Sequence, residues 1–176
     1  MSVIEAKSVV LLASSRPRGN TYALAGAAFQ GEAVRFVNLS ELQIGYYSYE
    51  NANEKDDFLR LVQELVVAPL WVLATPMYWY TVSAQAKTFL DRITDLLENH
   101  KALGRKLRGK SFAVVVAGTD PQPPASFDEP LKLTCRFLGM RYLGMHYAQF
   151  SEESFVSSSA AEDAAMFGRR VLEAAG

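Results

Sequence analysis

Hydroxyl, amide and guanidinium side chains gather in one short stretch near the start of the chain. Ser14, Arg16, Asn20 and Thr21 lie between an apolar run and an alanine-rich segment, which predicts a buried strand, a loop and the first turn of a helix. A helix start presents unpaired N–H groups and the positive end of the helix dipole, and the arginine and hydroxyl groups add donors that suit a phosphate. The stretch matches neither a Walker P-loop nor G-x-G-x-x-G, and the same residue types also cap helices that bind no ligand.

The elements that must position this loop alternate regularly between strand and helix. We expect strands at residues 9–13, 33–38, 70–74, 111–117 and within 141–150, and helices at 21–30, 57–67, 83–99, 131–138 and 162–174. Thr75 and Pro76 are expected to end the third strand. The pattern predicts an α/β fold: one flavodoxin-like, doubly wound, five-stranded parallel sheet of order 2-1-3-4-5, with helices on both faces, in a single domain over residues 1–176. Ligands of such sheets bind beyond the carboxyl ends of the strands, where the strand order reverses.

Two further loops are expected at that same edge of the sheet. Residues 75–83 follow the third strand and contain Met77, Tyr78, Trp79 and Tyr80, which cannot all point into a core. Some of them should line a crevice that suits a flat ring, although a loop packed on another loop or subunit would have the same composition. Gly118 ends the fourth strand and permits close backbone approach, or belongs to an ordinary proline-rich turn. A phosphate at one end and a flat ring at the other describe FMN.

Three motifs together resemble the NAD(P)H-dependent FMN reductase family, which includes quinone-, azo-dye- and chromate-reducing flavoproteins. They are Ser14-x-Arg16-x-x-Gly19-Asn20-Thr21, then Thr75-Pro76-Met77-Tyr78-Trp79, then Val82-Ser83-Ala84-Gln85-x-Lys87-x-Phe89-x-Asp91-Arg92. The resemblance covers residues 8–150 and implies a flavodoxin-like fold, non-covalent FMN, NAD(P)H as co-substrate, and a homodimer or homotetramer. It implies that the phosphate is held by Ser14, Arg16, Asn20 and Thr21, and that the isoalloxazine ring lies along Pro76, Met77, Tyr78 and Trp79, with Gly118 and Thr119 near its other edge.

The loop of residues 45–53 departs from the iron–sulfur branch of that family. It carries Tyr46, Tyr47 and Tyr49 but no cysteine, so an iron–sulfur cluster is excluded there. The tyrosines are compatible with a cover over the flavin, a contact with a second subunit, or a loop packed on itself. Arg18 has no role in the family pattern and is either solvent-exposed or a partner for the 2′-phosphate of NADPH.

Other reactive residue types have structural interpretations. Lys87 and Asp91 stand four residues apart on one helix, which predicts a surface ion pair, and we expect a structural role for Arg92 beside them. The single cysteine, Cys135, is expected to be buried and inert, and His146 to be a hydrogen-bonded residue of the last strand. The basic run at 101–110 lacks aromatic residues and is expected to be a solvated connection into the fourth strand.

Composition narrows the class of protein. The 176 residues are 49% hydrophobic and 21% charged, with a net charge of −1, so nothing suggests a nucleic-acid partner. The N-terminal apolar run is too short for a signal peptide, and no run is long enough to span a membrane. We therefore expect a cytoplasmic protein without a membrane partner.

The predicted activity is transfer of a hydride from a nicotinamide through bound FMN to a small acceptor such as a quinone or free flavin, with no catalytic protein residue and no metal. One alternative is a flavodoxin-like electron carrier, although such carriers are strongly acidic and this chain is not. Another is a cofactor-free module such as a receiver domain, whose acidic metal site is replaced here by Ser14, Ser15 and Arg16. The sequence leaves open NADH against NADPH, the acceptor, dimer against tetramer, and the role of the tyrosines.

Overall fold

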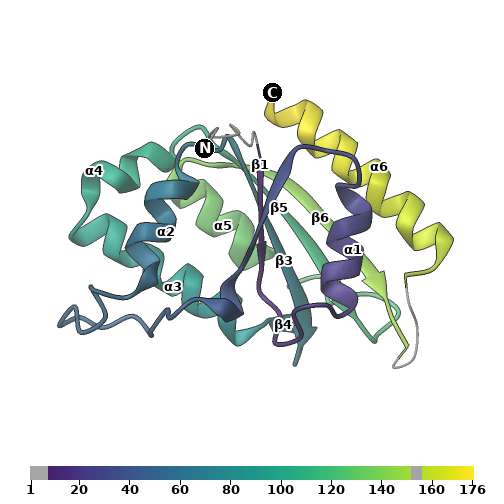
Figure 1. The fold of residues 1–176 in the computed structure, drawn as a ribbon, viewed down its shortest axis with the longest axis horizontal. Coiled ribbons are helices and arrows are strands. Elements are labelled where there is room, and N and C mark those ends of the chain that lie inside the picture. Colours follow the sequence, from purple (N-terminus) through teal and green to yellow (C-terminus); the bar gives the residue numbers. More distant parts are fainter. Residues whose placement is uncertain (1–7, 152–155) are drawn as a thin grey trace.

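The computed structural model describes residues 8–151 and 156–176, and its centre is a mainly parallel sheet. The strands lie in the order β2-β1-β3-β5-β6, with β4 paired to β3 off this path (Figure 1). Their bounds are β1 Ser8–Leu12, β2 Val34–Asn38, β3 Leu70–Tyr78, β4 Thr81–Val82, β5 Ser111–Gly118 and β6 Arg141–Gln149. The α/β class is as predicted, but the expectation of five strands is corrected to six, because the short antiparallel β4 was not foreseen.

The third strand also runs further than the sequence predicts. Pro76 was expected to end it, yet β3 continues to Tyr78 and pairs Pro76 with Ala117 of β5. β1 pairs with β3 only as far as Ala74. At Pro76, β3 is therefore no longer paired with β1 on that side. Because proline has no N–H to donate, its position there interrupts no hydrogen bond of the sheet.

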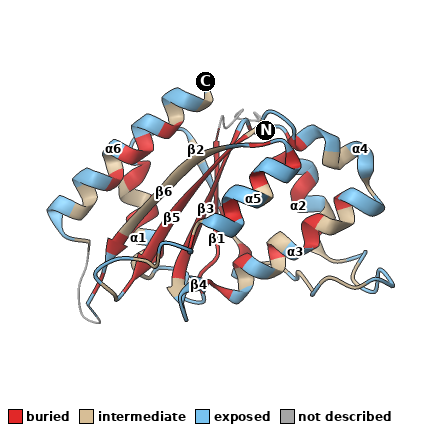
Figure 2. Cartoon of the chain, turned by 180° about the vertical axis from the view of Figure 1, so that it is seen from behind, coloured by how far each residue is buried: buried red, intermediate tan, exposed pale blue. Residues whose placement is uncertain are grey.

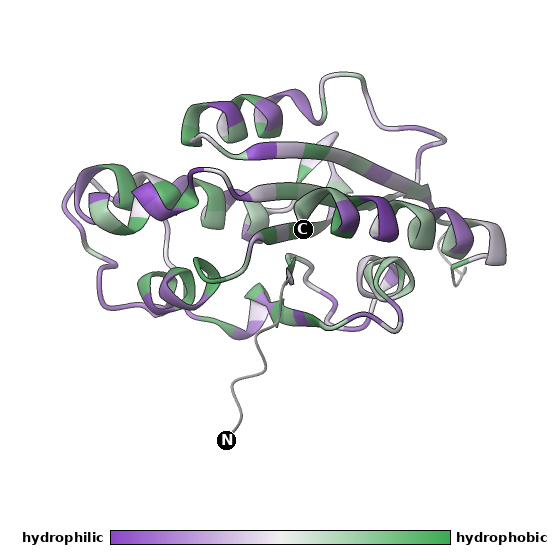
Figure 3. Cartoon of the chain, turned by 90° about the horizontal axis from the view of Figure 1, so that it is seen from above, coloured by the Kyte–Doolittle hydropathy of each residue, from purple (hydrophilic) through white to green (hydrophobic). Residues whose placement is uncertain are grey.

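Helices cover both faces of the sheet. α1 (Asn20–Ala28) and α6 (Ser158–Ala175) pack on one face, and α2 (Asp57–Leu65), α3 (Ala84–Glu98), α4 (Lys101–Gly104) and α5 (Glu129–Leu138) lie on the other (Figures 1 and 3). Single-turn 3-10 helices occur at Leu39–Glu41 and Arg105–Leu107. The basic run at 101–110 thus contains α4 and a 3-10 turn, and is not only a connection. All residues of β1 and β5 are buried, as strands covered on both faces must be (Figure 2).

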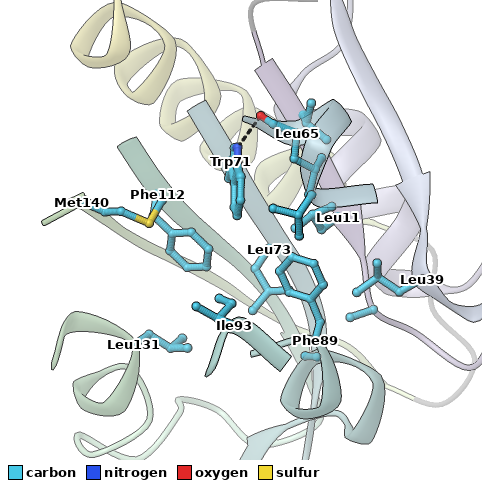
Figure 4. Close-up of a cluster of buried hydrophobic side chains, with 14 of the residues drawn as sticks. Leu11, Leu39, Leu65, Trp71, Leu73, Phe89, Ile93, Phe112, Leu131 and Met140 are labelled. Atoms are coloured by element: carbon cyan, nitrogen blue, oxygen red, sulfur yellow. Dashed lines mark hydrogen bonds between the residues drawn. The ribbon is translucent and has the colours of Figure 1, made fainter. Parts of the chain in front are cut away.

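The larger part of the core lies under α2, α3 and α5. Trp71, Leu73 and Phe89 are fully or almost fully buried in it, and the indole Nε1 of Trp71 donates to the carbonyl of Leu65 at 2.9 Å (Figure 4). Because the polar atom of Trp71 is satisfied, the large ring can be buried without an unpaired donor. This packing fixes β3 against α3, and so fixes the segment that joins them.

Candidate functional site

Three segments meet at the carboxyl edge of the sheet, as the strand order requires. They follow β1, β3 and β5, which are direct neighbours. Ser83, which caps α3, donates its hydroxyl to the carbonyl of Ala13 at 2.7 Å and accepts from the N–H of Ala86. Gln85 donates its amide to the hydroxyl of Ser15 at 2.9 Å. The start of α3 is therefore bonded directly to the loop that follows β1.

The first segment, between β1 and α1, retains the features that suit an anion. α1 begins at Asn20, one residue before the expected start, and Gly19 caps it with no side-chain hydrogen bond. The first amides of the helix therefore receive no side-chain cap, which is the arrangement of a helix start that can hold a phosphate. Arg16 and Arg18 are exposed beside it, which is compatible with both interpretations of Arg18.

Two hydroxyl residues of this segment, Ser14 and Thr21, are less accessible to a ligand. Ser14 is buried, and its hydroxyl accepts from the N–H of Arg16 at 3.3 Å, which shapes the loop. Thr21 is also buried, at 2% exposure, in the first turn of α1. Arg16 and the amides around Asn20 are thus the groups that face solvent most openly, and Ser14 contributes to the turn itself.

The second segment is a hairpin with an unusual backbone. Residues Tyr78 to Thr81 join β3 to β4, and Trp79 and Tyr80 at the turn have φ values of 49° and 64°. Two-residue hairpins favour asparagine and glycine at such positions, because a left-handed conformation costs a bulky L-residue about 1–2 kcal/mol. Trp79 is 93% exposed, so neither residue recovers that cost by burial. Strain of this kind persists most often at functional sites.

The exposure of residues 76–80 increases along the chain, from the end of β3 into the turn of the hairpin. Pro76 is buried and Met77 is half-buried, while Tyr78, Trp79 and Tyr80 are exposed. The prediction that not all of them point into the core is confirmed. The side chains instead form an open aromatic surface at the edge of the sheet where the first segment lies.

The third segment, after β5, is braced by side chains of β6 that the sequence analysis did not single out. Tyr147 donates its hydroxyl to the carbonyl of Asp120 at 2.6 Å, and Gln149 donates its amide to the carbonyl of Thr119 at 2.9 Å. Burial, and then the charge of Asp120, raise the pKa of Tyr147. A Cβ added to Gly118 would lie 2.5 Å from the Tyr147 oxygen, so any other residue there would require the Tyr147 ring to move.

Arg92 anchors the tyrosine-containing loop of residues 45–53 to α3. Its guanidinium is 2% exposed, pairs with Asp56 and with Asp95 (2.7 Å), and donates to the carbonyls of Gly45 and Asn53. Burial disfavours its charge, but the hydrogen bonds to the two carboxylates outweigh burial and raise the pKa of Arg92. The expected structural role of Arg92 is therefore confirmed, in the form of a buried ion network.

The neighbouring charges on α3 behave as predicted. Lys87 and Asp91 form an exposed ion pair at 2.6 Å. The ion pair between Arg92 and Asp56 was not predicted, because Asp56 stands 36 residues away and no local spacing relates the two. Asp56 also accepts from the N–H groups of Gly45 and Phe58, so it caps α2 and closes the loop at once.

The three tyrosines of the loop have different surroundings. Tyr47 and Tyr49 pack edge to face with ring centroids 5.1 Å apart, and the Tyr47 hydroxyl donates to Glu98 of α3 at 3.3 Å. Burial of Tyr47, and then Glu98, raise its pKa. Tyr46 and Tyr49 are 78% and 83% exposed. Part of the loop is therefore packed on itself, but the rings of Tyr46 and Tyr49 remain largely on its surface.

Cys135 and His146 are the two other reactive residues that the sequence analysis considered, and both lie outside the site. Cys135 is buried, as expected, and burial raises the pKa of its thiol to about 12, so it is unreactive at neutral pH. The expectation of a hydrogen-bonded His146 is wrong for one nitrogen, because its Nε2 is buried without a hydrogen-bond partner among the described residues. The ring stacks on Phe167 instead.

Comparison with known proteins gives a consistent picture. A family described as NADPH-dependent FMN reductase matches residues 6–154. A Bacillus subtilis protein named as an NAD(P)H-dependent FMN-containing oxidoreductase, YwqN, is 24% identical over 66% of this chain and 69% of its own length. An iron–sulfur flavoprotein of Archaeoglobus fulgidus is 29% identical over 69% of this chain, which spans only 60% of that relative.

Solved structures share the fold. The Trp repressor binding protein from Bacillus subtilis superposes with a TM-score of 0.75 at 20% identity, covering 91% of this chain and 96% of its own. At that identity the likeness establishes the flavodoxin-like arrangement of strands and helices and nothing about ligands. Within the residues that the structure describes, none of the helices is long and apolar enough to cross a bilayer.

Proposed function

The chain belongs to the NADPH-dependent FMN reductase family, and from that premise we propose that it takes a hydride from NAD(P)H on bound FMN and passes it to a small acceptor. Membership makes it an NAD(P)H-dependent, FMN-linked oxidoreductase and confirms the resemblance seen in its sequence. One observation carries the finer proposal. The uncapped start of α1, with exposed arginines beside it, lies at the same edge of the sheet as the hairpin with exposed aromatic side chains. The loop that follows Gly118 lies at this edge too.

The residues at this edge fit FMN by their chemistry. Arg16 and the amides at Asn20 and Thr21 would hold the phosphate, and Ser14 would keep the turn in shape. The backbone and side chains of residues 76–79 would line the isoalloxazine ring, and Gly118 and Thr119 would lie at its other edge.

FMN, when bound, supplies the redox chemistry, accepting a hydride and releasing electrons to an acceptor. The protein then has three tasks. Arg16 and the start of α1 would neutralise the phosphate, and backbone N–H groups of the hairpin would stabilise negative charge on the ring. The exposed aromatic surface of Tyr78 to Tyr80 offers a platform for a flat acceptor such as a quinone or another flavin. No acid, base or nucleophile of the protein is needed.

We further propose a homodimer or homotetramer that works in the cytoplasm, where NAD(P)H is regenerated. An apolar surface between α3 and α5 supports self-association: Leu97, Leu133 and Phe137 are exposed there, and Phe137 is 76% exposed. Exposed apolar patches of this kind mark interaction surfaces. Light scattering of the purified chain, loaded with FMN, measures the oligomeric mass directly, and a monomeric mass would contradict this part of the proposal.

Substitution of Arg16 tests the cofactor assignment. Because a hydrogen bond to a charged group contributes about 1.5–3 kcal/mol, Arg16→Ala should weaken FMN binding about tenfold or more, as measured by quenching of flavin fluorescence. Arg60→Ala is the matched control, since Arg60 is an exposed arginine on α2 that pairs only with Asp57 among the ion pairs of the described chain. Equal FMN affinity in the Arg16 and Arg60 variants would contradict the phosphate assignment.

A further inference from the structure

A second cleft lies beside the proposed flavin site, on the face of the sheet that α3 covers. It has a volume of about 440 Å³ and runs between the segment after β2 and the first turns of α3. Leu42, Ile44 and Tyr46 form one wall, and Ala84, Gln85 and Thr88 form the other. The volume lies in the range of small-molecule sites.

The lining of the cleft is mixed, with polar and apolar surface in nearly equal parts, and none of its described lining residues carries a charge. Leu42 and Ile44 pack against the core and present their remaining surface to the cleft. The amide of Gln85 and the hydroxyl of Thr88 are the side-chain groups on the α3 wall that can pair with polar edges of a ligand. This mixture of apolar surface and hydrogen-bonding groups suits an uncharged heterocycle with polar edges.

The wall that carries Tyr46 is held rigidly. Asp57 accepts from the N–H of Gln43, whose carbonyl accepts from the N–H of Asp57, at 2.8 and 2.9 Å. Two residues further on, Gly45 is bonded through both its N–H and its carbonyl to the network of Asp56 and Arg92. The exposed ring of Tyr46 is thus presented on a fixed backbone, and a site built in advance loses less freedom on binding.

The cleft is connected to the loop that we assign to phosphate. Gln85 lines the cleft and donates to Ser15, which is followed along the loop by the exposed Arg16 and Arg18. Arg18 is not used by the proposed FMN phosphate site, so a ligand with a flat uncharged ring and a phosphate arm would place the ring in the cleft and the arm toward Arg18. The adenosine half of a nicotinamide dinucleotide has this construction.

We propose that this cleft binds the adenine ring of NAD(P)H, with Tyr46 stacked on it. The proposal rests on the function proposed above and extends it, since it gives the co-substrate a second attachment away from the flavin. It also gives Tyr46 a role that the packing of Tyr47 and Tyr49 does not supply.

Binding of adenosine 2′,5′-bisphosphate to the FMN-loaded protein tests the cleft without any redox step. By calorimetry, the wild type and Tyr46→Phe should bind this probe alike, and Tyr46→Ala should bind it three- to tenfold more weakly through loss of stacking. Thr88→Trp, which fills the cleft, should abolish binding. Lys87→Trp is the matched control, because Lys87 is the exposed neighbour on α3 and does not line the cleft.

Rapid anaerobic reduction separates the adenine site from the flavin site. Thr88→Trp should raise the apparent Kd of NADPH at least tenfold with an unchanged limiting rate, while reduced nicotinamide mononucleotide, which lacks adenosine, should behave as in the wild type. Equal effects on both nucleotides, or no loss of probe binding in Thr88→Trp, would overturn the proposal. A change of oligomeric mass in Thr88→Trp would also overturn it, since a second copy of the chain would then occupy the cleft.

Failure of the proposed function gives a different result. If neither nucleotide reduces the wild-type flavin, the reductase assignment is wrong, and the calorimetric experiment still decides whether the cleft takes adenosine.

Discussion

At the scale of single residues, Arg92 joins α3 to the loop of residues 45–53 and to the start of α2. It is buried, it pairs with two carboxylates, and it lies over the Phe58 ring with its guanidinium carbon 4.8 Å from the ring centre. Removing one member of such a network leaves charges that are partly buried and no longer compensated. The ion pair of Lys87 and Asp91 on the same helix is exposed, so breaking it leaves no buried charge without a partner.

We therefore expect Arg92→Met to lower the free energy of unfolding by about 3–5 kcal/mol, because Asp56 and Asp95 lose their counter-charge. Lys87→Ala on the same helix should lower it by less than about 1 kcal/mol. Urea unfolding followed by circular dichroism measures both. A loss in Arg92→Met no larger than that in Lys87→Ala would show that the network is not coupled to folding.

His146 makes stability depend on pH. Burial lowers its pKa below the ordinary 6.5, and Arg170 lowers it further while Asp163 opposes the shift. The unfolded chain therefore binds a proton at a higher pH than the folded chain does. The stabilising contribution of neutral His146 is complete above pH 6.5 and is lost as the pH falls below it.

Urea midpoints at several pH values between 7.5 and 5 measure this effect. His146→Gln should reduce the fall in stability over that range relative to the wild type. Identical slopes for the wild type and His146→Gln would mean that His146 is not the group responsible.

At the scale of elements, α1 and α6 pack closely against each other where Gly168 of α6 meets the end of α1. A Cβ added to Gly168 of α6 would lie 1.7 Å from the carbonyl oxygen of Ala28, at the end of α1. The helices approach so closely only because Gly168 has no side chain. α1 also carries the proposed phosphate site at its other end, so this contact helps to fix that site on the sheet.

Gly168→Ala should therefore lower the unfolding free energy by about 1–3 kcal/mol, because the backbone of α1 or α6 must move. Gly26→Ala is the counterpart within α1, where an added Cβ meets nothing within 4 Å, and it should raise the unfolding free energy by about 0.5–1 kcal/mol through helix propensity. Thermal unfolding of the two variants should shift in opposite directions. Stabilisation by Gly168→Ala would show that the helices are further apart than described.

The elements were predictable where a pattern is local. Continuous apolar runs predicted the positions of β1 and β5, and the helix expected at residues 83–99 matches α3 to within a residue at each end. The prediction failed at β3, because whether proline ends a strand depends on how far the neighbouring strand extends. It also missed β4, since its turn uses Trp79 and Tyr80 where asparagine and glycine are usual.

At the scale of the whole molecule, the alternation of strands and helices was sufficient to place three loops at one edge of the sheet. The sequence could therefore predict which residues of the site gather there. It could not predict the braces from Tyr147 and Gln149, the Arg92 network or the Tyr46 cleft, because each joins segments that only the folded chain brings together.

The central claim is that this chain holds FMN and reduces it with NAD(P)H, and one spectrum tests it most directly. The purified protein is soaked with FMN, desalted, and titrated with NADPH and then NADH without oxygen, while the visible flavin band is recorded. We predict that the band is retained after desalting, bleaches on addition of nucleotide, and returns when a quinone is added. A retained flavin that stays oxidised with both nucleotides, or no retained flavin at all, would contradict the account.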